Sequence, residues 1–176
     1  MWVPEPREEG DEDGRDEVEM ATALGANRQT VYVGTGEGEL LAWNWQGSPQ
    51  MKLRLTGEAI VSLCVDRRGL RAAQSGDTVT YFREESISGK SSHAGQRPSM
   101  AALEKELVLW TRYASWTVDA RGVVQWAARW EKPIVTCVPV AGGFAVVSGS
   151  GLYRFGQGEA MRRDEPNSVP GQALGW

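Results

Sequence analysis

Residues 30–47 read TVYVGTGEGELLAWNWQG. This stretch starts with the β-branched and aromatic run 30–33, turns at the glycine-rich segment 34–38, and continues with the apolar run 40–45. Two strand-like runs on either side of a glycine turn are the sequence pattern of a β-hairpin. Similar hairpins follow downstream, so the sequence predicts an all-β repeat protein.

The repeat is visible as an internal match between segments 74 residues apart. The matching pairs are 60–62 with 134–136, 69–70 with 143–144, and 72–73 with 146–147. The second strands of successive units are expected to begin near residues 30, 70, 107 and 144, at steps of 40, 37 and 37. A period of this length, filled by three or four short strands, is typical of propeller blades. Each blade must bury both faces against its neighbours, which explains the apolar residues on both faces of the inner strands.

Two hairpins carry a family resemblance. Residues 31–43, VYVGTGEGELLAW, resemble the blade hairpin of quinoprotein-like and other WD40-like propellers, and residues 149–155, GSGLYRF, resemble a shorter version. The resemblance covers residues 18–163 and implies a propeller fold. The Gly-His and Trp-Asp dipeptides of true WD40 repeats are absent, and the cofactor-binding residues of the quinoprotein enzymes cannot be mapped. We therefore expect no cofactor and no inherited catalysis. The chain is also similar in character to the short propeller of bacterial systems that pair a MoxR ATPase with a von Willebrand-type protein.

The expected organisation has an acidic, disordered tail at 1–17, a repeat domain at 18–163 and a polar tail at 164–176. The expected blades are 18–58, 59–98, 99–132 and 133–163. Four blades is the fewest that usually closes a propeller. The prediction is therefore about four blades of three to four antiparallel strands, either a small closed ring or a partial propeller completed by another chain.

Three segments leave the secondary structure open. Residues 101–106 favour helix and strand equally, because apolar residues around them also have helical spacing. Residues 123–130 fit both periods as well, and the repeat register favours a strand there. Residues 84–98 are polar and rich in serine and glycine, so they predict either an exposed loop in place of a fourth strand or a poorly formed edge.

Charge and hydropathy exclude some functions. Residues 1–19 hold nine of the 23 acidic residues but two of the 19 basic ones, which leaves the rest of the chain with 14 acidic and 17 basic residues. This weak, scattered positive balance does not predict nucleic-acid binding. No apolar run is long enough for a membrane-spanning helix, and no secretory signal precedes the repeats. We expect a cytoplasmic protein.

The chain offers little raw material for catalysis or metal binding. Cys64 and Cys137 lie in apolar runs and are expected to be buried thiols, with a disulfide between them as the alternative. A single histidine, His93, argues against a histidine metal site. The glycine turn at 34–38 leads into a strand and has no Lys-Ser/Thr ending, so a phosphate loop is not predicted. Ser150 lies in a Gly-Ser-Gly sequence, but a catalytic triad would require His93 from a distant polar loop.

The eight tryptophans are the unusual feature of the composition. Trp43 and Trp45 are expected to fill the space between blades. If residues 123–130 form an outer strand, Trp126 and Trp130 lie near the rim with Arg129 beside them. Aromatic residues and arginine at a rim are typical of binding hot spots, so these three are the predicted partner-binding residues. Packing of both tryptophans against the next blade is the other interpretation, and the sequence slightly favours it over the rim role.

The leading functional hypothesis is a non-catalytic protein-interaction scaffold or subunit of a multiprotein assembly, either homo- or hetero-oligomeric. The first alternative is a small-molecule-binding or hydrolytic propeller that uses its central channel, with Arg71, Tyr153 and Arg154 as the polar groups expected there. The second alternative is a partial propeller that is stable only when another chain supplies the missing blades.

Overall fold

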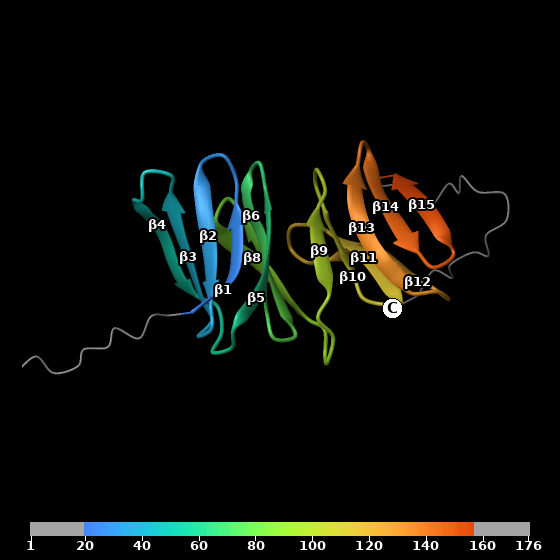
Figure 1. Ribbon diagram of the computed structural model, residues 1–176, viewed down its shortest axis with the longest axis horizontal. Coiled ribbons are helices and arrows are strands. Elements are labelled where there is room, and N and C mark those ends of the chain that lie inside the picture. Colours follow the sequence, from blue (N-terminus) through green and yellow to red (C-terminus); the bar gives the residue numbers. More distant parts are fainter. Residues whose placement is uncertain (1–19, 157–176) are drawn as a thin grey trace, which may run out of the picture.

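The structure is a computed structural model that describes residues 20–156. These residues form 15 strands and no helix. The strands make four antiparallel sheets, three of four strands and a last one of three (Figure 1). The predicted all-β class, with three to four antiparallel strands in each unit, is confirmed. The predicted tails at 1–17 and 164–176 lie outside the described residues.

Each sheet is a meander in which consecutive strands pair. The first sheet contains β1 (Ala21–Ala26), β2 (Thr30–Thr35), β3 (Glu39–Asn44) and β4 (Pro49–Arg54). The second contains β5 (Ile60–Asp66), β6 (Gly69–Ser75), β7 (Thr78–Arg83) and β8 (Ser86–Ser92). The third contains β9 (Ser99–Ala102), β10 (Leu107–Trp110), β11 (Ala114–Val118) and β12 (Val124–Arg129). The last contains β13 (Ile134–Val140), β14 (Gly143–Ser148) and β15 (Gly151–Gly156).

The structure shows no helix in the three ambiguous segments: it has strands in 123–130 and 84–98, and the end of a strand followed by a turn in 101–106. Strand β9 ends at Ala102, and a turn that joins Leu103 N–H to Glu106 C=O leads into β10, so residues 101–106 contain no helix. Strand β12 pairs with β11 throughout its length and confirms the strand interpretation of 123–130. Strand β8 supplies the fourth strand within 84–98, and most of its residues are exposed, as on an edge.

Three apolar clusters hold the sheets together, one at each junction between consecutive sheets. The middle sheets contribute to two clusters at once because neighbouring residues of a strand point to opposite faces. In β6, Ala73 packs toward the first sheet and Ala72 toward the third. In β10, Leu107 and Leu109 pack toward the second sheet and Val108 toward the last. This alternation is why the sequence has apolar residues on both faces of its inner strands.

Two glycines of the opening hairpin allow the close approach of the first two sheets. A Cβ on Gly34 would lie 2.5 Å from Ile60 Cγ2 and 2.6 Å from Ile60 Cβ. Gly38 has a φ of +81°, and a Cβ there would lie 2.5 Å from the Thr56 carbonyl oxygen. A side chain at Gly34 would push the second sheet away, and one at Gly38 would clash with the segment that joins the two sheets, so the hairpin needs glycine for packing as well as for turning.

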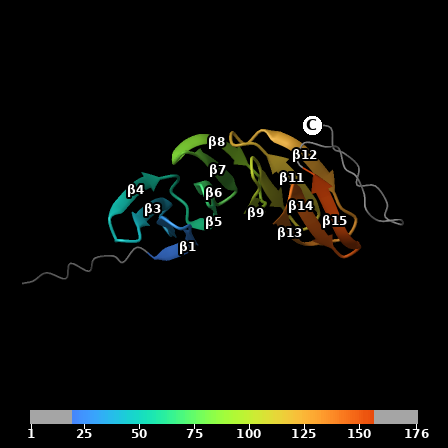
Figure 2. The same cartoon turned by 90° about the horizontal axis from the view of Figure 1, so that it is seen from above.

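The sheets follow an open arc (Figure 2). The innermost strands β1, β5, β9 and β13 contact one another in that order, and β4, β8 and β12 lie on the outer side. The first and last sheets lie at opposite ends of the long axis of the molecule (Figure 1). Of the two forms that the sequence allows, the described residues adopt the partial propeller and not the closed four-blade ring.

The internal match survives in the strand register up to a bulge. Ser62, Leu63 and Cys64 of β5 occupy the same places as Thr136, Cys137 and Val138 of β13. The register of β5 shifts again between Cys64 and Val65, and β13 has no counterpart of this second shift. The extra residue at this shift is Arg71 of β6, so Gly69 and Leu70 still match Gly143 and Phe144, and the equivalence slips by one residue after Arg71. Ala72 and Ala73 therefore correspond to Ala145 and Val146, instead of the Val146 and Val147 that the sequence spacing predicts.

We predict that Gly34→Ala destabilises the fold by about 1–3 kcal/mol, because the new methyl group overpacks the first junction. Urea unfolding followed by tryptophan fluorescence measures the change. Gly36→Ala is the matched control, since a Cβ there meets nothing closer than 3.9 Å and its effect should stay within about 0.5 kcal/mol. Equal stability of the Gly34 and Gly36 variants would contradict this packing.

Candidate interaction surfaces at the two ends of the arc

The outward face of the last sheet has the residue pattern of a buried junction. The strand register aligns four of its residues with four residues that the second sheet buries against the third. The residues of the last sheet are Val138, Ala145, Val147 and Leu152, and they correspond in this order to Cys64, Ala72, Gln74 and Val79 of the second sheet. We call these four residues of the last sheet the last end face. Val79 is 0% exposed, whereas Leu152 is 58% exposed and Val138 is 40% exposed, because no other sheet of residues 20–156 covers this face; the smaller Ala145 is buried.

The outward face of the first sheet has the same character. Leu24, Val33 and Leu41 form one cross-strand row, and Val31 with Trp43 forms the next. None of the five belongs to the cluster that fills the first junction, so they lie on the opposite face. We call them the first end face. Leu24 is 72% exposed although its equivalent in the second sheet, Leu63, packs into the first junction.

Trp43 shows most clearly that the first end face is a junction face. Register places it at the position of Phe82 in the second sheet and Phe155 in the last sheet. Phe82 fills the first junction and Phe155 fills the third. A large aromatic residue at this position therefore packs against a preceding sheet wherever a preceding sheet is present. An ion pair between Lys52 Nζ and Glu39 Oε2, 2.9 Å long, lies near the edge of this face.

Of the predicted partner-binding residues, the two tryptophans lie at the third junction. Trp126 packs on Phe144 and Phe155, with ring centroids 5.5 and 5.0 Å away. Trp130 packs on Tyr153 at 4.9 Å, and its Nε1–H donates a hydrogen bond of 2.9 Å to Ser115 Oγ. Both tryptophans are half-buried, whereas Arg129 is exposed. The structure thus shows the packing alternative for the two rings, and partner binding by the three residues stays a prediction.

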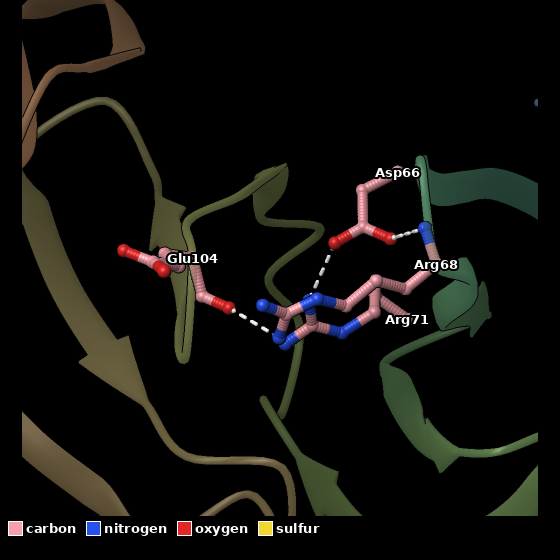
Figure 3. A network of polar contacts seen from close by, with 4 residues as sticks. All are labelled: Asp66, Arg68, Arg71 and Glu104. Atoms are coloured by element: carbon pink, nitrogen blue, oxygen red, sulfur yellow. Dashed lines mark hydrogen bonds and ion pairs between the residues drawn. The ribbon is translucent and has the colours of Figure 1, made fainter.

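The polar groups expected in a central channel are not brought together. Arg71 pairs with Asp66, with 2.5 Å between Nη1 and Oδ2, and both side chains are largely buried. The neighbouring Arg68 donates to the Glu104 carbonyl oxygen at 2.9 Å and so ties the β5–β6 turn to the third sheet (Figure 3). Arg154 and Tyr153 lie on β15 of the last sheet, where Arg154 donates to the Ala141 carbonyl oxygen. These contacts give Arg71 a structural role.

Ser150 and His93 do not form a catalytic pair. Ser150 Oγ lies 2.9 Å from Ser148 Oγ and accepts a hydrogen bond from the Tyr153 hydroxyl. His93 Nε2 lies 2.7 Å from Ser91 Oγ, in the second sheet. The Asp77 carboxylate, which would have to orient the His93 ring, accepts instead from Gly95 N–H at 2.6 Å. Burial lowers the pKa of His93, and nearby Asp77 opposes this shift.

Cys64 and Cys137 are free thiols at different junctions, so the disulfide alternative is wrong for this structure. Burial raises the pKa of each thiol to about 12, because desolvation disfavours the thiolate. Within residues 20–156, no group of three or more histidine, cysteine or acidic side chains is arranged to hold a metal ion. The same residues contain no helix able to cross a membrane.

Comparison with solved structures shows the fold. No family model matches the sequence, and no curated protein matches it. BamB from Moraxella catarrhalis superposes with a TM-score of 0.60 and 16% identity, over 78% of this chain and 50% of BamB. BBS1N, crystallised in complex with ARL6DN, superposes with a TM-score of 0.65 and 16% identity, over 80% of this chain and 53% of its own. The computationally designed Ika4 protein gives 0.62 and 12% identity, over 80% of this chain and 93% of Ika4.

BamB and BBS1N are propellers, and the chain spans about half the length of each. The predicted resemblance to divergent, WD40-like propeller blades is therefore confirmed. Each sheet is one blade, and the described residues form four blades of a propeller in an open arc. At these identities the likeness shows the fold alone.

The sequence interpretation missed the two end faces. The expectation that Trp43 and Trp45 fill the space between blades is not met within residues 20–156, because neither belongs to a junction cluster and Trp45 is 59% exposed. The signal that pointed to these faces was the alternation of apolar residues in the first and last units, which is as two-sided as in the middle units. Terminal repeats of solenoid proteins usually carry a polar outer face instead.

We predict that Trp126→Ala lowers the free energy of unfolding by about 3 kcal/mol, because it removes the aromatic packing between the third and last blades. Thermal and urea unfolding measure the loss. Arg129→Ala is the control on the same strand and should change stability by less than about 0.5 kcal/mol, since its side chain is exposed. An unchanged midpoint for Trp126→Ala would show that the ring contributes little to the junction.

We also predict that both thiols are inert in the folded protein at pH 8 and react once it is unfolded in urea. A colorimetric thiol assay should count two reactive groups only after unfolding. Because the folded pKa lies above the unfolded value of about 8.5, the unfolded chain loses its thiol protons first as the pH rises. Stability should therefore be maintained below about pH 8.5 and decline above it. Fast labelling of the native protein would contradict the burial of both groups.

Proposed function

We propose that this chain is a non-catalytic protein-interaction subunit that joins a larger assembly through its two end faces. The observation that carries the proposal is the pair of apolar junction faces left without a neighbouring blade. Leaving these side chains in water costs free energy that a covering protein surface recovers, at roughly 25 cal/mol for each Å² of apolar area buried. Contiguous exposed apolar surface is a mark of protein interaction sites.

The two faces also fit the composition of interfaces. The first end face has an aromatic residue, Trp43, among aliphatic side chains, and the charged pair Lys52–Glu39 lies near its edge. Protein interfaces likewise have an apolar, aromatic centre and a polar rim. BBS1N, one of the propellers that this chain resembles, was crystallised in a complex, which supports the use of this fold for interaction.

The absence of enzymatic activity is part of the proposal. It is supported by the polar groups with which Ser150, His93 and Arg71 are already engaged, because these contacts hold the side chains in structural roles. A cytoplasmic location is proposed with it, supported by two cysteines that remain unpaired, as in a reducing compartment.

Trp126, Arg129 and Trp130 remain a proposed second contact surface on the outer strand β12. Arg129 is exposed there, and half-buried tryptophans flank it along the strand. Replacing either tryptophan with alanine would also destabilise the fold, since both rings pack on the last blade. A loss of binding in these variants could therefore not be assigned to a lost contact with the partner. A charge reversal, Arg129→Glu, tests this surface without disturbing the junction.

The proposal predicts that a glutamate introduced into either end face strongly reduces the capture of partner proteins. Tagged chains carrying Trp43→Glu or Leu152→Glu should recover partner proteins from native extract at least about tenfold less well than wild type, because an unpaired carboxylate in an apolar interface costs several kcal/mol. Ile87→Glu is the control, since Ile87 is an exposed apolar residue of β8, on neither end face. Arg129→Glu is assayed alongside. Quantitative mass spectrometry gives the recoveries and thermal unfolding shows that each variant is folded. Equal recovery by wild type and both end-face variants would contradict the proposal.

A further inference from the structure

The two end faces are of opposite type. Each inner blade has a forward side, which packs on the next blade in the sequence, and a backward side, which packs on the preceding blade. At every junction between described blades, the forward side of one blade meets the backward side of the next. The last end face is a forward side, equivalent to the side of the second blade that packs on the third. The first end face is a backward side, equivalent to the side of the second blade that packs on the first. The chain therefore carries both halves of one further junction, at opposite ends of its arc.

A closed four-blade ring would join the two faces within one molecule. The arc does not allow this, because the first and last blades lie at opposite ends of the long axis (Figure 1). Four blades of this chain cover 50% of BamB and 53% of BBS1N. The four-blade arc therefore superposes on about half of each of these propeller chains, as half of a ring would.

We infer that a second copy of this chain covers both end faces and closes an eight-blade ring. This inference rests on the proposed function and identifies the partner. A two-fold axis places the first end face of each copy on the last end face of the other, so two identical junctions form at once and no junction face remains exposed. Closed two-fold assemblies are the commonest form of soluble oligomer. Trp43 then occupies the role that Phe82 and Phe155 have within the chain.

A second copy fits these faces better than an unrelated protein would. An unrelated partner would need a forward side and a backward side, held at the spacing of a half ring. A second copy of this chain has one forward side and one backward side at the same spacing, because its arc is identical. The Ika4 protein, of which this superposition covers 93%, shows that a chain of about this size with this fold exists as a crystallised protein.

The test is the mass in solution of the full 176-residue chain, measured by light scattering during gel filtration, for wild type and single end-face variants. Wild type should have twice the 19.3 kDa chain mass. Trp43→Glu, on the first end face, and Leu152→Glu, on the last, should each give the single-chain mass, because every junction of the ring contains both faces. Ile87→Glu should remain a dimer. Circular dichroism and thermal unfolding show whether each variant retains its strands, and Trp43→Ala and Leu152→Ala replace any charged variant that unfolds.

Each other outcome overturns the ring. If only one of the two glutamate variants loses the dimer, the two copies pair through the same end face instead of closing a ring. If the wild-type mass exceeds that of two chains, the copies join head to tail in an open polymer. A wild-type monomer at all concentrations would show that a second copy is not the partner. In that case, capture of a different protein that still depends on Trp43 and Leu152 leaves the proposed function standing, whereas capture that ignores both residues removes the proposed function as well.

Discussion

The structure depends on apolar packing between consecutive sheets. Hydrogen bonds complete each meander of three or four strands internally, but a single small sheet with apolar residues on both faces cannot bury them alone. Each of the three junctions therefore supplies the burial that two neighbouring sheets need. The same requirement applies to the outermost blades, whose outward faces have the residue pattern of a junction although no further sheet of residues 20–156 covers them.

The hairpins and their repetition could be predicted because they rest on local chemistry. Glycines such as Gly38, with its positive φ, punctuate the chain where strands must turn. Apolar residues at every position of an inner strand indicate a sheet covered on both sides. The internal match between 60–62 and 134–136 follows the true register, since both segments are the innermost strands of their blades. The match fails after Leu70, because the bulge that inserts Arg71 into β6 leaves no mark in the spacing.

Features that depend on the arrangement of whole blades could not be predicted from the sequence. Curvature decides between a closed ring and an open arc, and it results from many small packing contacts such as the approach of Ile60 to Gly34. The same limit applies to side chains with two plausible neighbours. The alternation of residues along the strand is compatible with Trp126 and Trp130 lying either at the rim or at the junction. The contacts of both rings with Phe155 show that they pack inward. The pairing of Arg71 with Asp66 likewise requires the turn geometry between them.

In the ring that we infer, a second copy completes both end faces, and the concentration dependence of thermal unfolding tests this assembly most directly. Unfolding of a two-chain ring must separate the copies, so dilution favours the unfolded state by mass action. A hundredfold increase in protein concentration adds about 2.7 kcal/mol of stability, which should raise the midpoint by a few degrees. A midpoint that is identical across that range would contradict the inferred ring.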